Sequence, residues 1–111
     1  MLNNEKLETK KTMEYLKSVG VFCYAIPSVV FSKNKSGVPV GYKKGMPDLC
    51  VPRYKLYLEM KAIKPGKVKE HEEKQNKIHE TLRGEGCHVF RCEGFEEARE
   101  IIDIFYRKNV Q

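Results

Sequence analysis

The amino-acid sequence predicts an α/β protein in which helices cover a central mixed β-sheet. Stretches with a helical apolar period alternate with short stretches of β-branched and aromatic residues, in the order α-β-β-β-α-β-α. A chain of 111 residues suits one domain with a modest core. It contains no repeat, low-complexity tract or linker, so residues 1–111 are predicted to form a single domain.

The first part of the chain predicts a helix, a strand and a loop. Residues 5–18 have one apolar face among many lysines and are followed by Gly20, a typical helix stop. Residues 21–31 are rich in β-branched and aromatic side chains, which favours a strand interrupted at Pro27. Residues 32–46 combine glycines and lysines and predict a loop.

The middle of the chain predicts a β-hairpin followed by a helix. Residues 48–51 and 56–62 are predicted strands, joined by the four-residue turn 52–55. Pro65-Gly66 breaks this pattern, and residues 68–83 have the composition and apolar spacing of a helix.

The C-terminal part predicts one more strand, residues 87–92, and a last helix, residues 95–107. The helix has a wide apolar face, which either packs on the sheet or forms half of a dimer interface. Its predicted inward-facing side chains are Ala98, Ile101, Ile102, Phe105 and Tyr106.

Composition excludes several classes of protein. Apolar residues make up 41% and charged residues 32% of the chain, as in globular proteins. No stretch reaches the ~18 apolar residues of a membrane helix, and the charged N-terminal residues predict no signal peptide. The four cysteines have neither zinc-site spacing nor the density of a secreted disulfide scaffold. We therefore expect a reduced, cytoplasmic protein with no membrane partner.

The positive charge is concentrated in the middle third of the chain. The net charge is +6, but residues 33–69 alone carry ten Lys or Arg and two acids, so the remainder sums to −2. A concentrated basic segment is typical of a surface that binds a polyanion, and a solvated lysine-rich loop is the alternative. The two acids inside this segment are Asp48 and Glu59.

The hairpin turn predicts the register of its two strands. A turn centred between residues 53 and 54 places Leu49 opposite Leu58 and Val51 opposite Leu56. Because side chains alternate between the faces of a sheet, these residues and Met60 share one apolar face. That face is predicted to belong to the core.

The other face of the hairpin carries a group of charged side chains. Asp48 lies opposite Glu59, and Lys61 follows on the same side. Opposed Cβ atoms are about 4.5–5.5 Å apart, so the two carboxylates would repel by roughly 3 kcal/mol at an effective dielectric near 20. A divalent cation would remove this repulsion. Alternatively, the acids are solvated and Lys61 neutralises one of them, but their position inside the basic segment favours a metal site.

With their flanks, these residues resemble the virus-type replication-repair nuclease (VRR-NUC) domain, a branch of the PD-(D/E)xK, restriction-endonuclease-like superfamily. The matching text is Gly45-Met46-Pro47-Asp48-Leu49, Leu58-Glu59-Met60-Lys61, a Pro-Gly turn, a helix holding Gln75, and Gly86 before a short strand. The resemblance implies a restriction-endonuclease-like α-β-β-β-α-β core and a metal-dependent DNA endonuclease. For small stand-alone phage members it further implies a homodimer that cuts branched DNA such as four-way (Holliday) junctions.

The resemblance also implies roles for individual residues. Asp48 and Glu59 correspond to the ligands of Mg²⁺, with Mn²⁺ as a substitute, and the Met60 carbonyl to a third ligand. Lys61 corresponds to the lysine that contacts the attacking water or the scissile phosphate. Gln75 corresponds to the helix glutamine that supports the site and the DNA backbone.

The catalytic acid of the first helix has two candidates. In the family, the glutamate lies eleven residues before the leucine that ends this helix, and this spacing corresponds to Glu5 and Leu16. Glu8 is the second candidate. Both glutamates are also interpretable as surface acids. Of the three histidines, His79 lies one turn after Gln75, although a direct role in the site is the less favoured interpretation.

Six lysines in the basic segment are predicted to contact the DNA backbone without reading its sequence: Lys33, Lys35, Lys43, Lys44, Lys64 and Lys67. A non-catalytic nucleic-acid-binding module with the same fold is the alternative function. An RNA-directed nuclease would differ only in its substrate.

Overall fold

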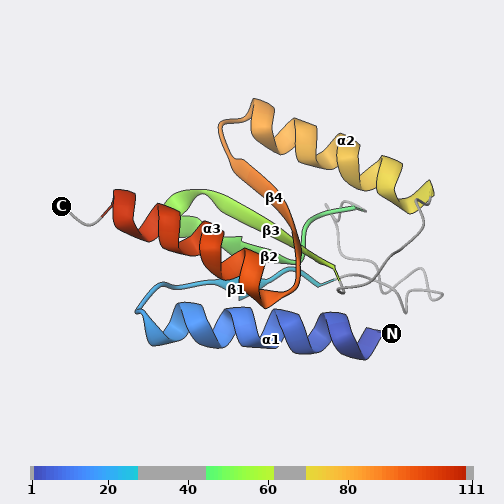
Figure 1. Ribbon diagram of the computed structural model, residues 1–111. Coiled ribbons are helices and arrows are strands. Elements are labelled where there is room, and N and C mark those ends of the chain that lie inside the picture. The colour runs from blue at the N-terminus through green and yellow to red at the C-terminus, as the bar shows by residue number, and fades with distance from the viewer. Residues whose placement is uncertain (1, 28–44, 62–69, 110–111) are drawn as a thin grey trace.

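The computed structural model describes residues 2–27, 45–61 and 70–109. The chain forms, in order, α1 (Leu2–Ser18), β1 (Tyr24–Ala25), β2 (Leu49–Val51), the 3-10 turn η2 (Pro52–Tyr54), β3 (Leu56–Lys61), α2 (Glu70–Gly84), β4 (His88–Glu93) and α3 (Phe95–Lys108). Figure 1 shows the sheet between α2 on one side and α1 with α3 on the other. The predicted α/β class and element order are therefore confirmed. Among the described helices, none has the length and apolar character needed to span a membrane.

The sheet is mixed and has the strand order β1-β2-β3-β4. β2 pairs antiparallel with β1 and with β3, whereas β4 returns through α2 to pair parallel with β3. The hairpin register is Leu49 opposite Leu58 and Val51 opposite Leu56, as the turn length predicts.

The core lies between the sheet and the layer formed by α1 and α3. Alternate hairpin residues supply its sheet side: Leu49, Val51, Leu56, Leu58 and Met60 are all at most 1% exposed. The helices contribute the remaining apolar side chains, of which Leu16, Ala98, Ile102 and Phe105 are buried. With one face of the hairpin sealed in this way, its alternate side chains must point to the α2 side.

Two predictions about local structure need correction. The strand predicted at 21–31 is observed only over Tyr24–Ala25, with one further backbone hydrogen bond from the Ile26 N–H to the Asp48 carbonyl before Pro27, which has no N–H to donate. Residues 28–31 lie outside the described residues, as does the predicted loop from 32 to 44. Tyr106, predicted to point inward, is 38% exposed.

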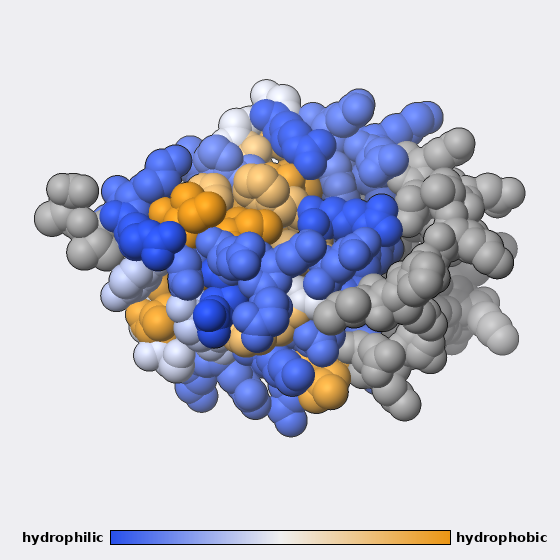
Figure 2. Space-filling model, viewed as in Figure 1, coloured by the Kyte–Doolittle hydropathy of each residue, from blue (hydrophilic) through white to orange (hydrophobic). Residues whose placement is uncertain are grey.

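The outer surface of α3 remains partly apolar. Ile104 is 49% exposed and Phe90 of β4 is 38% exposed. Figure 2 shows a largely hydrophilic surface on this side of the molecule, interrupted by an orange apolar patch between α2 and α3.

α1 holds the beginning of α3 through a partly buried hydrogen bond. The Phe95 N–H donates to Glu8 Oε1 at 2.7 Å, and Lys11 lies 3.6 Å from the other carboxylate oxygen. Glu8 therefore satisfies an N–H group in the first turn of α3, which has no partner within its own helix. This contact gives Glu8 a structural role and separates it from Glu5.

Replacing Glu8 with Ala is expected to lower the free energy of unfolding by about 1 kcal/mol, because the Phe95 N–H loses its acceptor. Thermal unfolding should show a decrease in Tm of roughly 4–8 °C. Glu14→Ala, an exposed position on the same helix, is the matched control. Equal Tm values for the two variants would contradict the capping role.

Candidate functional site

The charged side chains of the hairpin gather on the α2 side of the sheet. Asp48 immediately precedes β2, and its backbone is held on both sides: its N–H donates to Leu58 O at 3.1 Å, and its carbonyl accepts from the Ile26 N–H at 2.8 Å. Glu59 and Lys61 are alternate residues of β3 and therefore share one face. The sheet thus fixes the positions of these three side chains.

Asp48 is directed along the sheet toward the next strand. Its Oδ2 accepts the Met60 N–H at 2.7 Å. The N–H and C=O of a strand residue point to the same side, so the Met60 carbonyl is also directed toward Asp48. One carboxylate and one backbone oxygen therefore lie at the same edge of β3.

Gln75 connects α2 to the charged residues of β3. Its Nε2 donates to Glu59 Oε2 at 3.0 Å, and its Oε1 accepts from Lys61 Nζ at 3.2 Å. Lys61 Nζ is also 3.5 Å from Glu59 Oε2. The three predicted site residues thus form one hydrogen-bonded cluster.

Glu59 is buried, and one of its oxygens has no hydrogen-bond partner. The residue is 3% exposed, and within the described part of the chain Oε1 accepts no hydrogen bond. His79, which is 4% exposed, lies with Nε2 at 3.7 Å from this oxygen, and Nε2 is likewise unpartnered among the described residues. His79 is therefore a site residue that the sequence analysis ranked low. Its spacing of four residues from Gln75 is the signal that identifies it.

Asp48 lies in an environment that disfavours its charge. Burial is the largest cause that raises its pKa from 3.8 to about 7, and the charges of Glu59 and Glu5 raise it further. The Met60 N–H and the charge of Lys61 act in the opposite direction but do not compensate. Without a bound cation, the charged form of Asp48 is therefore unfavourable, chiefly because the group is buried and then because Glu59 is near.

Of the two candidate acids in α1, Glu5 is the one whose charge acts on Asp48. Glu8 instead contacts the N-terminus of α3. The structure thus brings Glu5, Asp48, Glu59, Lys61 and Gln75 to the same region. The six lysines predicted to contact DNA, Lys33, Lys35, Lys43, Lys44, Lys64 and Lys67, lie outside the described residues.

The donor set suits a hard divalent cation. Among the described residues, no three His, Cys, Asp or Glu side chains converge as a metal-binding group. The available donors are instead two carboxylates and the Met60 carbonyl. Mg²⁺ characteristically binds one or two carboxylates, retains several waters and takes its other ligands from a phosphate. Glu59 Oε1, which accepts no hydrogen bond from the described residues and lies 3.7 Å from His79 Nε2, would supply one ligand to such an ion. The residues present therefore fit Mg²⁺.

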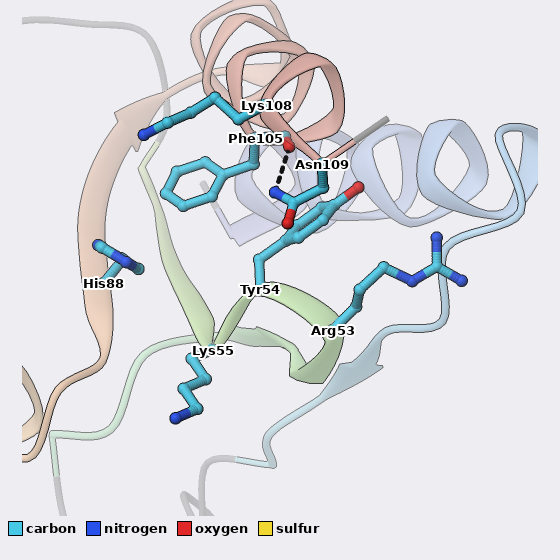
Figure 3. Close-up of a pocket in the computed structure, with 7 residues that line it drawn as sticks. All are labelled: Arg53, Tyr54, Lys55, His88, Phe105, Lys108 and Asn109. Atoms are coloured by element: carbon cyan, nitrogen blue, oxygen red, sulfur yellow. Dashed lines mark hydrogen bonds between the residues drawn. The ribbon is translucent and has the colours of Figure 1, made fainter. Parts of the chain in front are cut away.

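A separate pocket lies at the turn end of the hairpin, away from the acids. It has a volume of about 250 Å³ and is lined by Arg53, Tyr54, Lys55, His88, Phe105, Lys108 and Asn109. In Figure 3 the basic side chains surround the rings of Tyr54 and Phe105. Among the described residues that line this pocket there is no carboxylate and none of the predicted catalytic residues, so these residues do not supply the donors that a Mg²⁺ site requires.

Searches against protein-family models, curated proteins and solved structures found no match to this chain.

Proposed function

We propose that this chain is a divalent-metal-dependent DNA endonuclease with a restriction-endonuclease-like core of the VRR-NUC type. The observation that carries the proposal is the pair of neighbouring carboxylates, Asp48 and Glu59, of which the charge of the second raises the pKa of the first. One has a pKa raised to about 7, and the other has a buried oxygen without a partner among the described residues. The order of α1, β1, β2, β3, α2 and β4 supports the same core.

A cation would stabilise this arrangement. Asp48, Glu59 and the Met60 carbonyl would hold Mg²⁺, with Mn²⁺ as a substitute. When bound, such an ion supplies Lewis-acid polarisation of a phosphoryl oxygen and lowers the pKa of water. A purely structural sheet gains nothing from opposing two carboxylates, so the pair favours catalysis over simple binding.

The remaining site residues orient the reactants and offset charge. Lys61 carries an ammonium group beside Glu59 and can donate hydrogen bonds to the attacking water or to a phosphate oxygen, where negative charge increases in the transition state. Gln75 accepts from Lys61 and donates to Glu59, which fixes both side chains before substrate binds. By the family resemblance, water attacks phosphorus, the 3′ oxygen departs, and the products carry 5′-phosphate and 3′-hydroxyl ends.

Branched DNA is the substrate that the resemblance favours, with a homodimer as the active form. The concentration of basic residues in the middle third of the sequence supports a polyanionic substrate. The alternative function is a nucleic-acid-binding module without catalysis. This alternative predicts that the chain binds nucleic acid but cleaves none, with or without substitutions at the site.

The first test is cleavage of labelled four-way junction, flap, linear duplex and single-stranded DNA, each with Mg²⁺, Mn²⁺ or EDTA. We expect cleavage that requires metal and that Lys61→Ala reduces by about 10²-fold or more, the scale of losing one preorganised donor. Lys77→Ala removes an exposed lysine of α2 and should leave the rate unchanged. Binding of DNA without cleavage of any substrate would leave the binding module as the function.

A further inference from the structure

A row of side chains crosses the sheet directly beside the paired carboxylates. Tyr24 of β1 pairs with Cys50 of β2, which in turn pairs with Tyr57 of β3. Glu59 lies two residues from Tyr57 on β3, so these two side chains share one face, and the Asp48 carboxylate accepts the N–H of Met60, the residue after Glu59. Two residues along a strand span about 7 Å. The tyrosine row therefore lies about one nucleotide length from the carboxylates.

The aromatic side chains of this row are open to solvent. Tyr24 is 45% exposed, and Tyr57 is intermediate between buried and exposed. Phe22 extends the surface: it is 68% exposed, and its ring centroid is 6.1 Å from that of Tyr24. We call Phe22, Tyr24 and Tyr57 the aromatic platform. None of the three belongs to the hydrophobic core, so core packing does not explain them.

Cys50 lies between the two tyrosines in the sheet, opposite Tyr24 on one side and Tyr57 on the other. A hydrogen bond with the Cys50 thiol is the largest cause that raises the pKa of Tyr24 to about 12. Burial is the largest cause that raises the pKa of Tyr57, followed by the charge of Cys50 and a hydrogen bond with it.

We propose that the aromatic platform stacks an unpaired nucleobase of the nucleotide next to the phosphate held at Asp48 and Glu59. The proposal rests on the proposed nuclease function and specifies its substrate class: nucleic acid with an unpaired nucleotide at the cleavage point. Inside a duplex, both faces of a base are covered by its neighbours, whereas an unpaired base can turn one face to the platform. Every base has such a face, so recognition by stacking tolerates any sequence.

The test measures binding in EDTA, where no cleavage occurs. Fluorescein-labelled duplexes of equal length, either fully paired or with a single-stranded gap, are titrated with the full chain. We expect tighter binding of the gapped DNA, and a roughly tenfold loss of that affinity in Tyr24→Ala, the scale of losing one stacked base. Tyr24→Phe keeps the ring and should retain the affinity. Tyr106→Ala, a similarly exposed tyrosine on α3, is the matched control.

A direct readout comes from 2-aminopurine placed in the gap. Stacking on the platform should quench its fluorescence in the original chain and in Tyr24→Phe but not in Tyr24→Ala, with thermal unfolding used to verify that each variant is folded. The platform is overturned if gapped and paired DNA bind with equal affinity, or if Tyr24→Ala binds gapped DNA as tightly as the original chain does. Neither result bears on metal-dependent cleavage, which is measured separately. Selective binding with quenching but no cleavage supports the platform and overturns the nuclease. Binding to no nucleic acid overturns both.

Discussion

Asp48→Asn and Glu59→Gln should each lower the cleavage rate by at least about 10³-fold while leaving DNA affinity unchanged or increasing it. Each substitution removes one charged metal ligand, and the several kcal/mol of transition-state stabilisation that depend on the ion are lost with it. Each also removes a negative charge from a surface that a phosphate must approach, which favours binding. Single-turnover cleavage in Mg²⁺ and equilibrium binding in EDTA measure the two effects separately.

Glu85→Gln is the matched control for the loss of one negative charge. Glu85 is exposed and directly follows α2, so this variant should cleave as the original chain does. If Glu59→Gln acts by weakening metal binding, adding Mn²⁺ should partly restore the cleavage rate of this variant. Mn²⁺ binds a given oxygen and nitrogen site more tightly than the alkaline-earth ions that it replaces. Cleavage that persists at a similar rate in Asp48→Asn would exclude a catalytic role for the carboxylate pair.

Local rules are sufficient to predict the hairpin from the sequence. The alternation of apolar and charged residues, together with a turn of four residues, determines both the register and the face of each side chain. The structure pairs Leu49 with Leu58 and Val51 with Leu56 accordingly. For the same reason, the proximity of Asp48 to Glu59 was predictable.

Contacts between distant segments were not predictable in this way. The contact of Glu8 with the Phe95 N–H joins residues 87 positions apart, and no local pattern indicates it. The same holds for the contact of His79 with Glu59, since helical spacing places His79 near Gln75 but does not show which strand α2 covers. Tyr106 was misplaced because helical periodicity gives the direction of a residue but not the width of the buried stripe.

The carboxylate pair also connects function to stability. Lys61 and Gln75 both contact Oε2 of Glu59, whereas Oε1 has no hydrogen-bond partner among the described residues and lies 3.7 Å from His79 Nε2. The charge of Asp48, whose pKa is raised to about 7, remains unfavourable in the folded chain without metal. It follows that the free energy of unfolding of the metal-free protein should depend on the ionisation of the site.

In EDTA, the free energy of unfolding should fall as the pH rises from about 4 to about 7, and Asp48→Asn should remove this decrease. The pKa of Asp48 is raised from 3.8 to about 7 in the folded chain, chiefly by burial and then by the charge of Glu59. The stabilising contribution of Asp48 is thus fully present below pH 4, where its carboxyl group is protonated in both the folded and the unfolded chain. This contribution is lost as the pH rises through the folded-state pKa. The difference amounts to up to about 4 kcal/mol.

Chemical denaturation of the original chain and of Asp48→Asn, each at pH 5 and pH 8, measures this effect. The difference between the two proteins separates the contribution of Asp48 from that of all other titrating groups. Asn can still accept the Met60 N–H, so the backbone contact is retained while the charge is lost. At pH 8 Asp48→Asn should therefore be the more stable protein in EDTA, and saturating Mg²⁺ should reverse that order by stabilising only the original chain. Parallel pH profiles in EDTA would mean that Asp48 is well solvated. The electrostatic reason for a metal at this site would then be lost.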